Sequence, residues 1–144
     1  MADRSCSLSP EGWGRRAVET ALEFEADCIA VERNYGGDMA RSTIMQAARH
    51  AGAVTRVVDV QATRAKHVRF EPVAALAEQG RLHFPTEPLG LLEDECCNFT
   101  AFGYEGAGSP DRVDAMVWAL HELILNRRGL HWDDLYGGES HAMA

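Results

Sequence analysis

The sequence predicts an α/β domain whose sheet is largely parallel or mixed, and three observations support that expectation. Segments with helical spacing alternate with short apolar segments along the chain. Residues 28–31 (Cys-Ile-Ala-Val) are apolar at every position, which is typical of a strand buried on both faces of a parallel sheet. The 144 residues, 46% of them hydrophobic, suffice for one soluble domain with a sizeable core. Alternating helices and buried strands are the pattern of α/β proteins.

Start and stop signals set the order of the elements. Ser9 and Pro10 begin the first helix, because serine caps a helix and proline fits its first turn. Asp38 is expected to cap the second helix, and Gly52 and Gly80 end two helices. The expected helices are 10–25, 39–51, 66–79, 91–99 and about 111–128, and the expected strands are 28–31, 54–60 and 81–84. Residues 85–108 are rich in proline and glycine and are expected to be the loop-rich part of the domain.

The last helix is expected to bury one apolar face, since its apolar residues recur at three- and four-residue spacing. These residues are Val113, Met116, Val117, Leu120, Leu123 and Ile124. Beyond this helix, residues 131–144 are expected to fray. The sequence therefore predicts one domain over residues 1–130, followed by a C-terminal tail.

The charge balance argues against a protein whose whole surface binds nucleic acid. The chain has 14 Lys and Arg against 22 Asp and Glu, a formal net charge of −8. Six basic residues nevertheless lie between positions 41 and 69, with Asp59 the only acidic residue among them. They are Arg41, Arg49, Arg56, Arg64, Lys66 and Arg69. This segment is either a local positive patch on an acidic body or simply a solvated helix face.

Several classes of protein lack support in the sequence. No apolar run approaches the length of a membrane span, and the N-terminus has no signal-peptide pattern, so a cytoplasmic protein is the default expectation. The four cysteines have no C-x-x-C spacing and are expected to be reduced thiols. The six histidines include no H-x-x-x-H pair, which argues against a zinc site, and a Walker ATP-binding loop is absent.

Three carboxylates are candidates for a functional site. Glu32 directly follows the apolar run, at the carboxyl end of a strand, where ligands bind in open α/β sheets. Asp111 and Asp114 are spaced i, i+3, so both project from one side of a helix start. Each also has an explanation without any function. Glu32 is then a solvated loop residue, and the two aspartates are there because negative charge is favoured at a helix N-terminus. Together they would suit Mg²⁺ or Mn²⁺, which prefer carboxylate and water ligands and serve phosphodiester cleavage in two-cation sites.

Three segments, in order along the chain, resemble the C-terminal nuclease domain of the large terminase subunit of tailed phages. They are residues 29–39 (Ile-Ala-Val-Glu-Arg-Asn-Tyr-Gly-Gly-Asp-Met), residues 62–83, which begin Ala-Thr-Arg-Ala-Lys-His-Val-Arg-Phe-Glu-Pro-Val, and residues 109–120 (Ser-Pro-Asp-Arg-Val-Asp-Ala-Met-Val-Trp-Ala-Leu). The resemblance covers about residues 3–125. It implies an RNase H-like (resolvase/integrase-type) fold with a mixed sheet flanked by helices. It also implies a metal-dependent endonuclease that cuts concatemeric double-stranded DNA during genome packaging.

The resemblance implies roles for individual acids. Glu32 matches a carboxylate that ends the strand before a Gly-Gly turn. Asp111 and Asp114 match acids at a helix start, although Pro110 stands where relatives often have another aspartate. The three are therefore the expected catalytic residues and the expected ligands of Mg²⁺ or Mn²⁺.

Basic residues and partners follow from the same resemblance. Lys66 matches a basic residue that lies near the site, and Arg64 and Arg69 are expected to bind DNA beside it. The implied partners are double-stranded DNA, the terminase ATPase domain, the portal and the small terminase subunit.

One element of the family has no counterpart in this sequence. The strand that carries the family's first catalytic aspartate would precede a segment that residues 1–6 resemble, so the chain is expected to be a truncated piece of a large terminase. The remaining three acids are expected to hold at most one cation, weakly, and to cut DNA little or not at all. Two alternatives stay open: an inactive fragment that only docks to other packaging components, and a resolvase-like junction nuclease.

Overall fold

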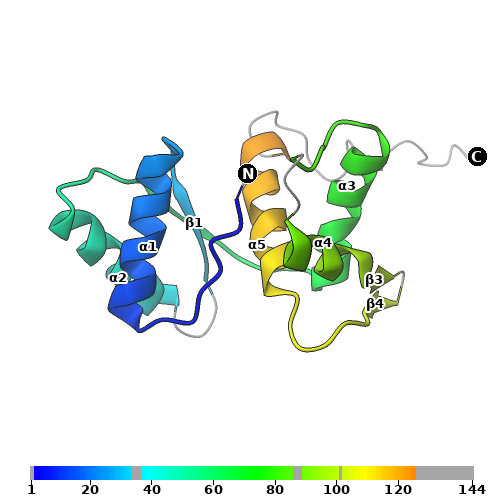
Figure 1. Ribbon diagram of the computed structural model, residues 1–144, viewed down its shortest axis with the longest axis horizontal. Coiled ribbons are helices and arrows are strands. Elements are labelled where there is room, and N and C mark those ends of the chain that lie inside the picture. The colour runs from blue at the N-terminus through cyan, green and yellow to red at the C-terminus, as the bar shows by residue number, and fades with distance from the viewer. Residues whose placement is uncertain (1, 34–36, 86–88, 101, 126–144) are drawn as a thin grey trace, which may run out of the picture. The chain divides into compact units, whose positions relative to one another are not determined.

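The computed structural model describes residues 2–33, 37–85, 89–100 and 102–125, which fall into two compact units (Figure 1). Residues 2–63 form the N-terminal unit, and the described residues from Arg64 onward form the C-terminal unit. Each unit has its own hydrophobic core. None of the helices in the described ranges is long and apolar enough to cross a membrane.

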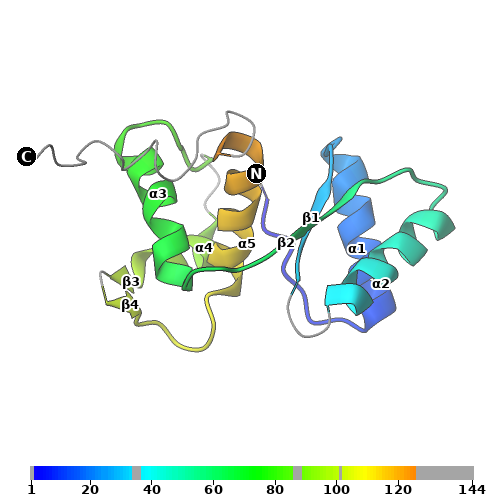
Figure 2. The ribbon, with the colours of Figure 1, turned by 180° about the vertical axis from the view of Figure 1, so that it is seen from behind.

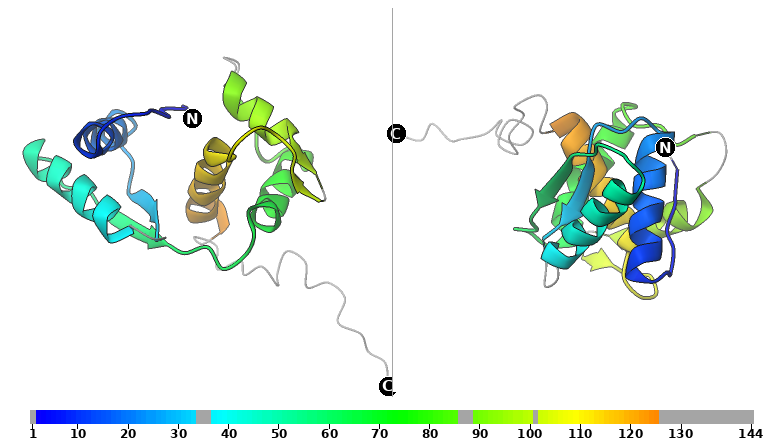
Figure 3. Two further views of the ribbon diagram at one scale, coloured as in Figure 1. Left: turned by 90° about the horizontal axis from the view of Figure 1, so that it is seen from below. Right: turned by 90° about the vertical axis from the view of Figure 1, so that its left-hand side faces the viewer.

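The N-terminal unit places two helices against a two-stranded parallel sheet. In chain order its elements are α1 (Pro10–Glu23), β1 (Ile29–Glu32), α2 (Gly37–His50) and β2 (Val57–Val60). β1 and β2 run side by side, with Ile29 opposite Val57 and Glu32 opposite Val60 (Figure 2). Both helices lie on the same face of these strands, as Figure 3 shows. The core between them consists of Val18, Val31, Ile44, Ala48 and Val57.

Local signals explain why this unit forms as it does. The hydroxyl of Ser9 accepts a hydrogen bond from the backbone N–H of Gly12, and Pro10 is the first helical residue, so α1 begins where the sequence predicts. Arg41 of α2 pairs with Asp59 of β2 at 3.1 Å and also donates to the carbonyl oxygen of Val57 at 3.1 Å. This pair joins the crossover helix to the strand that follows it.

The C-terminal unit is built mainly from helices. Its elements are α3 (Lys66–Glu78), α4 (Gly90–Cys97), β3 (Phe99–Thr100), β4 (Gly103–Tyr104), α5 (Asp111–Leu120) and the π-helical turn η1 (His121–Leu125). β3 and β4 form a short antiparallel hairpin. The buried core consists of Val73, Leu92, Val113, Met116, Val117 and Leu120. α5 contributes four of these residues, so it is the central helix of the unit.

The helices and the first two strands confirm the sequence-based expectations. The first four helices begin and end within two residues of the predicted bounds. β1 is shifted by one residue from the predicted strand 28–31, and β2 covers the last four residues of the predicted strand 54–60. Asp38, the expected N-cap of the second helix, instead lies in the first turn of α2, because that helix already begins at Gly37. The mixture of helices and strands is consistent with an α/β protein. The predicted domain end at residue 130 and the tail that follows it lie outside the described residues.

The predicted strand over residues 81–84 is wrong. Gly80, with a φ of +65°, ends α3, and the backbone N–H groups of Arg81 and Leu82 both donate to the carbonyl oxygen of Leu76. Leu82 and Phe84 pack against the core of the unit. The alternation that resembled a strand therefore reflects two side chains that cover the core, without strand pairing. The described strands accordingly form two separate two-stranded sheets, and a larger mixed sheet is not formed by them.

Two details near the end of the described chain also differ from the expectations. Leu123 was expected on the buried face of the last helix, yet 58% of its surface is exposed. It lies in η1, where the wider π turn changes which residues continue the buried stripe of α5, so Ile124 packs against the core and Leu123 does not. The β3–β4 hairpin was not predicted, because each of its strands has only two residues.

All four cysteines are free thiols, as the sequence predicts. Burial raises the pKa of the Cys96 thiol to about 11, so this side chain stays protonated near neutral pH. Cys6 and Cys97 are exposed.

The close approach of α1 to α2 predicts that Gly14→Ala destabilises the N-terminal unit. A Cβ atom at Gly14 would lie 2.7 Å from Cγ2 of Thr43, whose hydroxyl is held by the carbonyl oxygen of Met39. Overpacking costs about 1–3 kcal/mol, and the better helix propensity of alanine offsets about 1 kcal/mol of this. We expect urea denaturation to show a net loss of about 1 kcal/mol in the free energy of unfolding.

Gly90→Ala is the matched control for this substitution. A Cβ atom at Gly90, the first residue of α4, meets no described atom within 4 Å, so this variant adds the helix propensity of alanine without overpacking and should be at least as stable as the parent. A Gly14→Ala protein as stable as Gly90→Ala would contradict the close helix packing.

Candidate functional site

Two of the predicted acids lie together at the start of α5. Asp111 is the first residue of the helix and Asp114 lies one turn later, so both carboxylates project from the same side. Their environments differ sharply: the Asp111 side chain is 80% exposed, whereas that of Asp114 is 9% exposed. The i, i+3 spacing thus produces one solvated carboxylate and one buried carboxylate.

The buried carboxylate of Asp114 is paired on both oxygens. Nη2 of Arg69 lies 2.9 Å from its Oδ1, and Nζ of Lys66 lies 3.2 Å from its Oδ2. Arg69 is itself buried, with its guanidinium 4.7 Å from the ring centroid of Trp118. Lys66 and Arg69 are spaced i, i+3 on α3, so this pair of cations faces the pair of acids on α5.

Lys66 contacts the second acid as well. Its Nζ lies 3.4 Å from Oδ1 of Asp111 and donates to the hydroxyl oxygen of Ser109 at 3.0 Å, and the Ser109 hydroxyl in turn donates to Asp111. Burial alone would lower the pKa of Lys66, but the hydrogen bonds and negative charges of Asp114 and Asp111 outweigh it and raise the pKa. The ammonium is therefore charged at neutral pH and lies between the two carboxylates. Lys66, Arg69, Asp111 and Asp114 are called the α3–α5 cluster below.

Glu95 of α4, which no sequence pattern singled out, fixes the start of α5. Its buried carboxylate accepts hydrogen bonds from the backbone N–H groups of Arg112 at 3.0 Å and Val113 at 3.2 Å, and pairs with the Arg112 guanidinium at 2.9 Å. The N-cap residue of α5 is Pro110, whose side chain has no hydrogen-bond acceptor. A helix start with no capping side chain of its own requires hydrogen-bond acceptors from elsewhere in the chain. Pro110 at the N-cap position was therefore the sequence feature that could have indicated an acceptor such as Glu95.

His121 lies next to the cluster. It is buried, and its Nε2 lies 3.4 Å from the carbonyl oxygen of Arg69, which can accept a hydrogen bond from the ring. Burial lowers the pKa of His121, and this effect exceeds the opposing influence of that hydrogen bond. The neutral ring is thus the form that the folded unit favours.

Comparison with known proteins identifies the family. A family model described as the terminase RNaseH-like domain matches residues 5–123, which is most of the chain. The chain belongs to this terminase family. The match confirms the relationship expected from the sequence and spans Glu32, both acids of α5 and both cations of α3. No curated protein and no solved structure matches the chain.

Glu32, the third expected site residue of this terminase domain, lies in the N-terminal unit. It is the last residue of β1 and is partly buried, opposite Val60 of β2. Asp111 and Asp114 belong to the other unit, and the geometry of each unit by itself does not bring the three acids together. Their convergence therefore stays a prediction.

The cluster as it stands does not fit the divalent cation that the terminase family implies. Across the ranges that the structure describes, no group of three or more His, Cys, Asp or Glu side chains is placed to hold a metal ion. Asp111 and Asp114 supply two suitable oxygen donors, but Lys66 already lies within ion-pair distance of both. The two negative and two positive charges of the α3–α5 cluster cancel, which removes the excess negative charge that attracts Mg²⁺ or Mn²⁺.

The basic residues between positions 41 and 69 are less available than their number suggests. Arg41 pairs with Asp59, and Arg69 is buried beside Asp114, so neither presents a free charge at the surface. Arg64 is exposed, and Lys66 is partly exposed. The burial of Arg69 favours a role in holding Asp114 over direct contact with DNA, while DNA binding by Arg64 and Lys66 stays a prediction.

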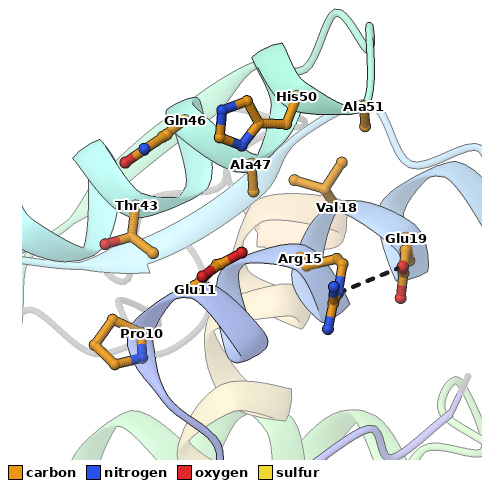
Figure 4. Close-up of a pocket in the computed structure, with 10 residues that line it drawn as sticks. All are labelled: Pro10, Glu11, Arg15, Val18, Glu19, Thr43, Gln46, Ala47, His50 and Ala51. Atoms are coloured by element: carbon orange, nitrogen blue, oxygen red, sulfur yellow. Dashed lines mark ion pairs between the residues drawn. The ribbon is translucent and has the colours of Figure 1, made fainter.

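A separate hollow lies between α1 and α2 of the N-terminal unit. It has a volume of about 710 Å³ and is lined by side chains of mixed character, including Glu11, Arg15, Glu19 and His50 (Figure 4). Arg15 and Glu19 approach each other at 4.0 Å across one turn of α1. The hollow contains none of the predicted site residues.

Capping by Glu95 predicts that Glu95→Ala weakens the C-terminal unit. The substitution leaves two backbone N–H groups and a guanidinium without their shared acceptor, at a buried position. We expect the free energy of unfolding to fall by about 3 kcal/mol in urea denaturation. Asp94→Ala removes the exposed neighbouring acid of α4 and serves as the control, with a change below about 0.5 kcal/mol. Equal losses in the two variants would argue against the capping role.

The lowered pKa of His121 predicts a pH dependence of stability. The unfolded chain binds a proton at this ring more readily than the folded chain does, so protonation favours unfolding. The stabilisation is present above about pH 6.5 and is lost as the pH falls through the lower pKa of the folded state. His121→Gln should therefore show a flatter pH dependence of the free energy of unfolding than the parent below about pH 6.5. Parallel curves for the two proteins would refute this assignment.

Proposed function

We propose that this terminase-family chain is a DNA-cutting domain that acts on double-stranded DNA during phage genome packaging. The family match over residues 5–123 supports a nuclease-type role in general. The observation that carries the proposal further is the pair of carboxylates on one side of the α5 start, at positions that match the acids of the family motif. An RNase H-like fold is part of the same proposal.

Glu32, Asp111 and Asp114 are the proposed catalytic residues, with Mg²⁺ or Mn²⁺ as the proposed metal. The support is the chemistry of the donors, because carboxylate oxygens are what these hard cations prefer. When bound, such a cation stabilises the charge that develops on the phosphate oxygens. Asp111 is the acid most accessible to a cation, whereas Asp114 is held from behind by Arg69.

The DNA surface is proposed to include Arg64 and Lys66. A net-acidic domain holds a phosphate backbone only through a local basic surface. Lys66 lies beside the α5 acids, and Arg64, two residues before it in the chain, is exposed. Arg69 acts instead through Asp114, whose orientation it fixes. The ATPase domain of the terminase, the portal and the small subunit are proposed partners through the family.

A second function, a docking module without nuclease activity, is favoured by one observation. The α3–α5 cluster is electrically balanced without any metal ion, so its residues satisfy one another as a purely structural ion-pair network does. The two functions differ in what Asp111 does. Its side chain is 80% exposed, so a structural role for it would be small.

Substitution of Asp111 tests the proposal. Nicking of supercoiled plasmid by the 144-residue chain in Mn²⁺ is expected to be slow, and Asp111→Asn should lower it by about 100-fold or more while the fold persists. Glu32→Gln should have a comparable effect. Asp94→Asn, which removes an exposed acid of α4, is the control and should nick like the parent.

Two outcomes would count against nuclease activity. The first is nicking that all of these variants share, which would identify it as contamination. The second is a parent protein that binds plasmid DNA and leaves it uncut at every Mn²⁺ concentration, which would favour the docking module.

A further inference from the structure

One side chain, that of Lys66, explains why the α3–α5 cluster does not fit a divalent cation. Lys66 Nζ lies 3.2 Å from Oδ2 of Asp114 and 3.4 Å from Oδ1 of Asp111, and it also donates to Ser109 at 3.0 Å. A metal ion shared by the two aspartates would need the same carboxylates that Lys66 already contacts. The ammonium thus takes the place of a cation in the cluster.

We propose that Lys66 and a divalent cation compete for the carboxylates of Asp111 and Asp114, so that the lysine serves as the built-in cation until a metal ion displaces it. The proposal rests on the proposed function only in taking these two aspartates as cation ligands. A metal ion on the same oxygens would lie beside a like charge, and the repulsion between them opposes simultaneous occupancy. Binding of the metal ion therefore favours departure of the Lys66 ammonium from these oxygens.

The two cations of the cluster differ in their ability to leave. Arg69 has a side chain that is 6% exposed, packed on Trp118 and paired with Oδ1 of Asp114. The side chain of Lys66 is 38% exposed and begins at the first residue of α3, so it can swing into solvent without disturbing the core. Exchange is thereby confined to Oδ2 of Asp114 and the exposed carboxylate of Asp111, while Arg69 keeps Asp114 in position.

The choice of residue types fits this division of roles. Lys66 is the one lysine in the sequence, and the other basic side chains of the 14 are arginine. Arginine suits a permanent planar pair, as at Arg69. Lysine carries a compact, strongly hydrated point charge on a flexible stem, which makes it the closer substitute for a metal ion and the easier one to release. A lysine at the exchangeable position and an arginine at the fixed one is the arrangement that competition requires.

Binding of Mn²⁺ to the full 144-residue chain, followed by electron paramagnetic resonance of the free ion, tests the competition. Lys66→Met removes the charge while keeping an unbranched side chain, and we expect it to bind Mn²⁺ about 10- to 100-fold more tightly than the parent. Lys66→Arg keeps the charge and should not gain affinity. Arg81→Met removes an exposed positive charge from the same unit and is the control for net charge, so it should match the parent.

The single lysine gives a second and independent measurement. Its acetylation by dilute acetic anhydride, which transfers an acetyl group to Nζ and releases acetate, should accelerate several-fold when Mg²⁺ or Mn²⁺ is added, as read by mass spectrometry of the peptide that contains Lys66. In Asp111→Asn the reaction should already be faster than in the parent without metal. Circular dichroism of each variant confirms that the fold is retained.

Clear results would overturn the proposal. Equal or weaker Mn²⁺ binding by Lys66→Met, an absence of Mn²⁺ binding by both proteins, or acetylation that saturating metal leaves unchanged would each do so. The proposed function is judged separately by plasmid nicking. Nicking that depends on Asp111, together with unchanged Mn²⁺ affinity in Lys66→Met, would reject the competition and keep the nuclease. Tighter Mn²⁺ binding by Lys66→Met without any nicking by the parent would keep the competition and reject the nuclease.

Discussion

Asp114 and Arg69 are charged side chains that the C-terminal unit takes almost completely out of water. A buried charge is tolerated only when it is paired and hydrogen-bonded, and removing one partner of such a pair costs about 3–5 kcal/mol. Their 2.9 Å contact therefore fixes α3 against the start of α5. The ring of Trp118, which lies further along α5, covers the Arg69 guanidinium and reinforces this packing. The positions of Lys66 and Asp111 follow, because each lies on a helix whose rotation the buried pair has set.

Glu95 adds a constraint on the same helix from a different direction. It anchors the first N–H groups of α5 to α4, so the start of the helix is held by a carboxylate on one side and by the buried ion pair on another. Side chains at a site function well only when their supporting contacts are rigid. Asp111 and Asp114 therefore project from a firmly placed turn, although Asp111 itself remains solvated.

The sequence predicted what depends on local chemistry. Helices with a capping serine, a proline in the first turn or a terminal glycine were located within two residues, and both strands of the parallel pair, β1 and β2, were expected at their places in the chain. It did not predict what depends on contacts distant along the chain. Leu82 and Phe84 alternate like a strand yet cover a core, and only the tertiary structure distinguishes the two. Glu95 caps a helix 16 residues further along the chain, and no local pattern connects the two.

The charges of the candidate site likewise depend on contacts between residues that are distant along the chain. The i, i+3 spacing placed Asp111 and Asp114 on one side of a helix, and this was correct. Lys66 and Arg69 have the same spacing on α3, so two opposite pairs with matching geometry were present in the sequence. Read together, they indicate an ion-pair contact between two helices before they indicate a metal site, since unlike charges in matching register neutralise each other. A metal-binding role then requires one of the cations to be replaceable, and exposure distinguishes them: Lys66 reaches solvent, whereas Arg69 does not.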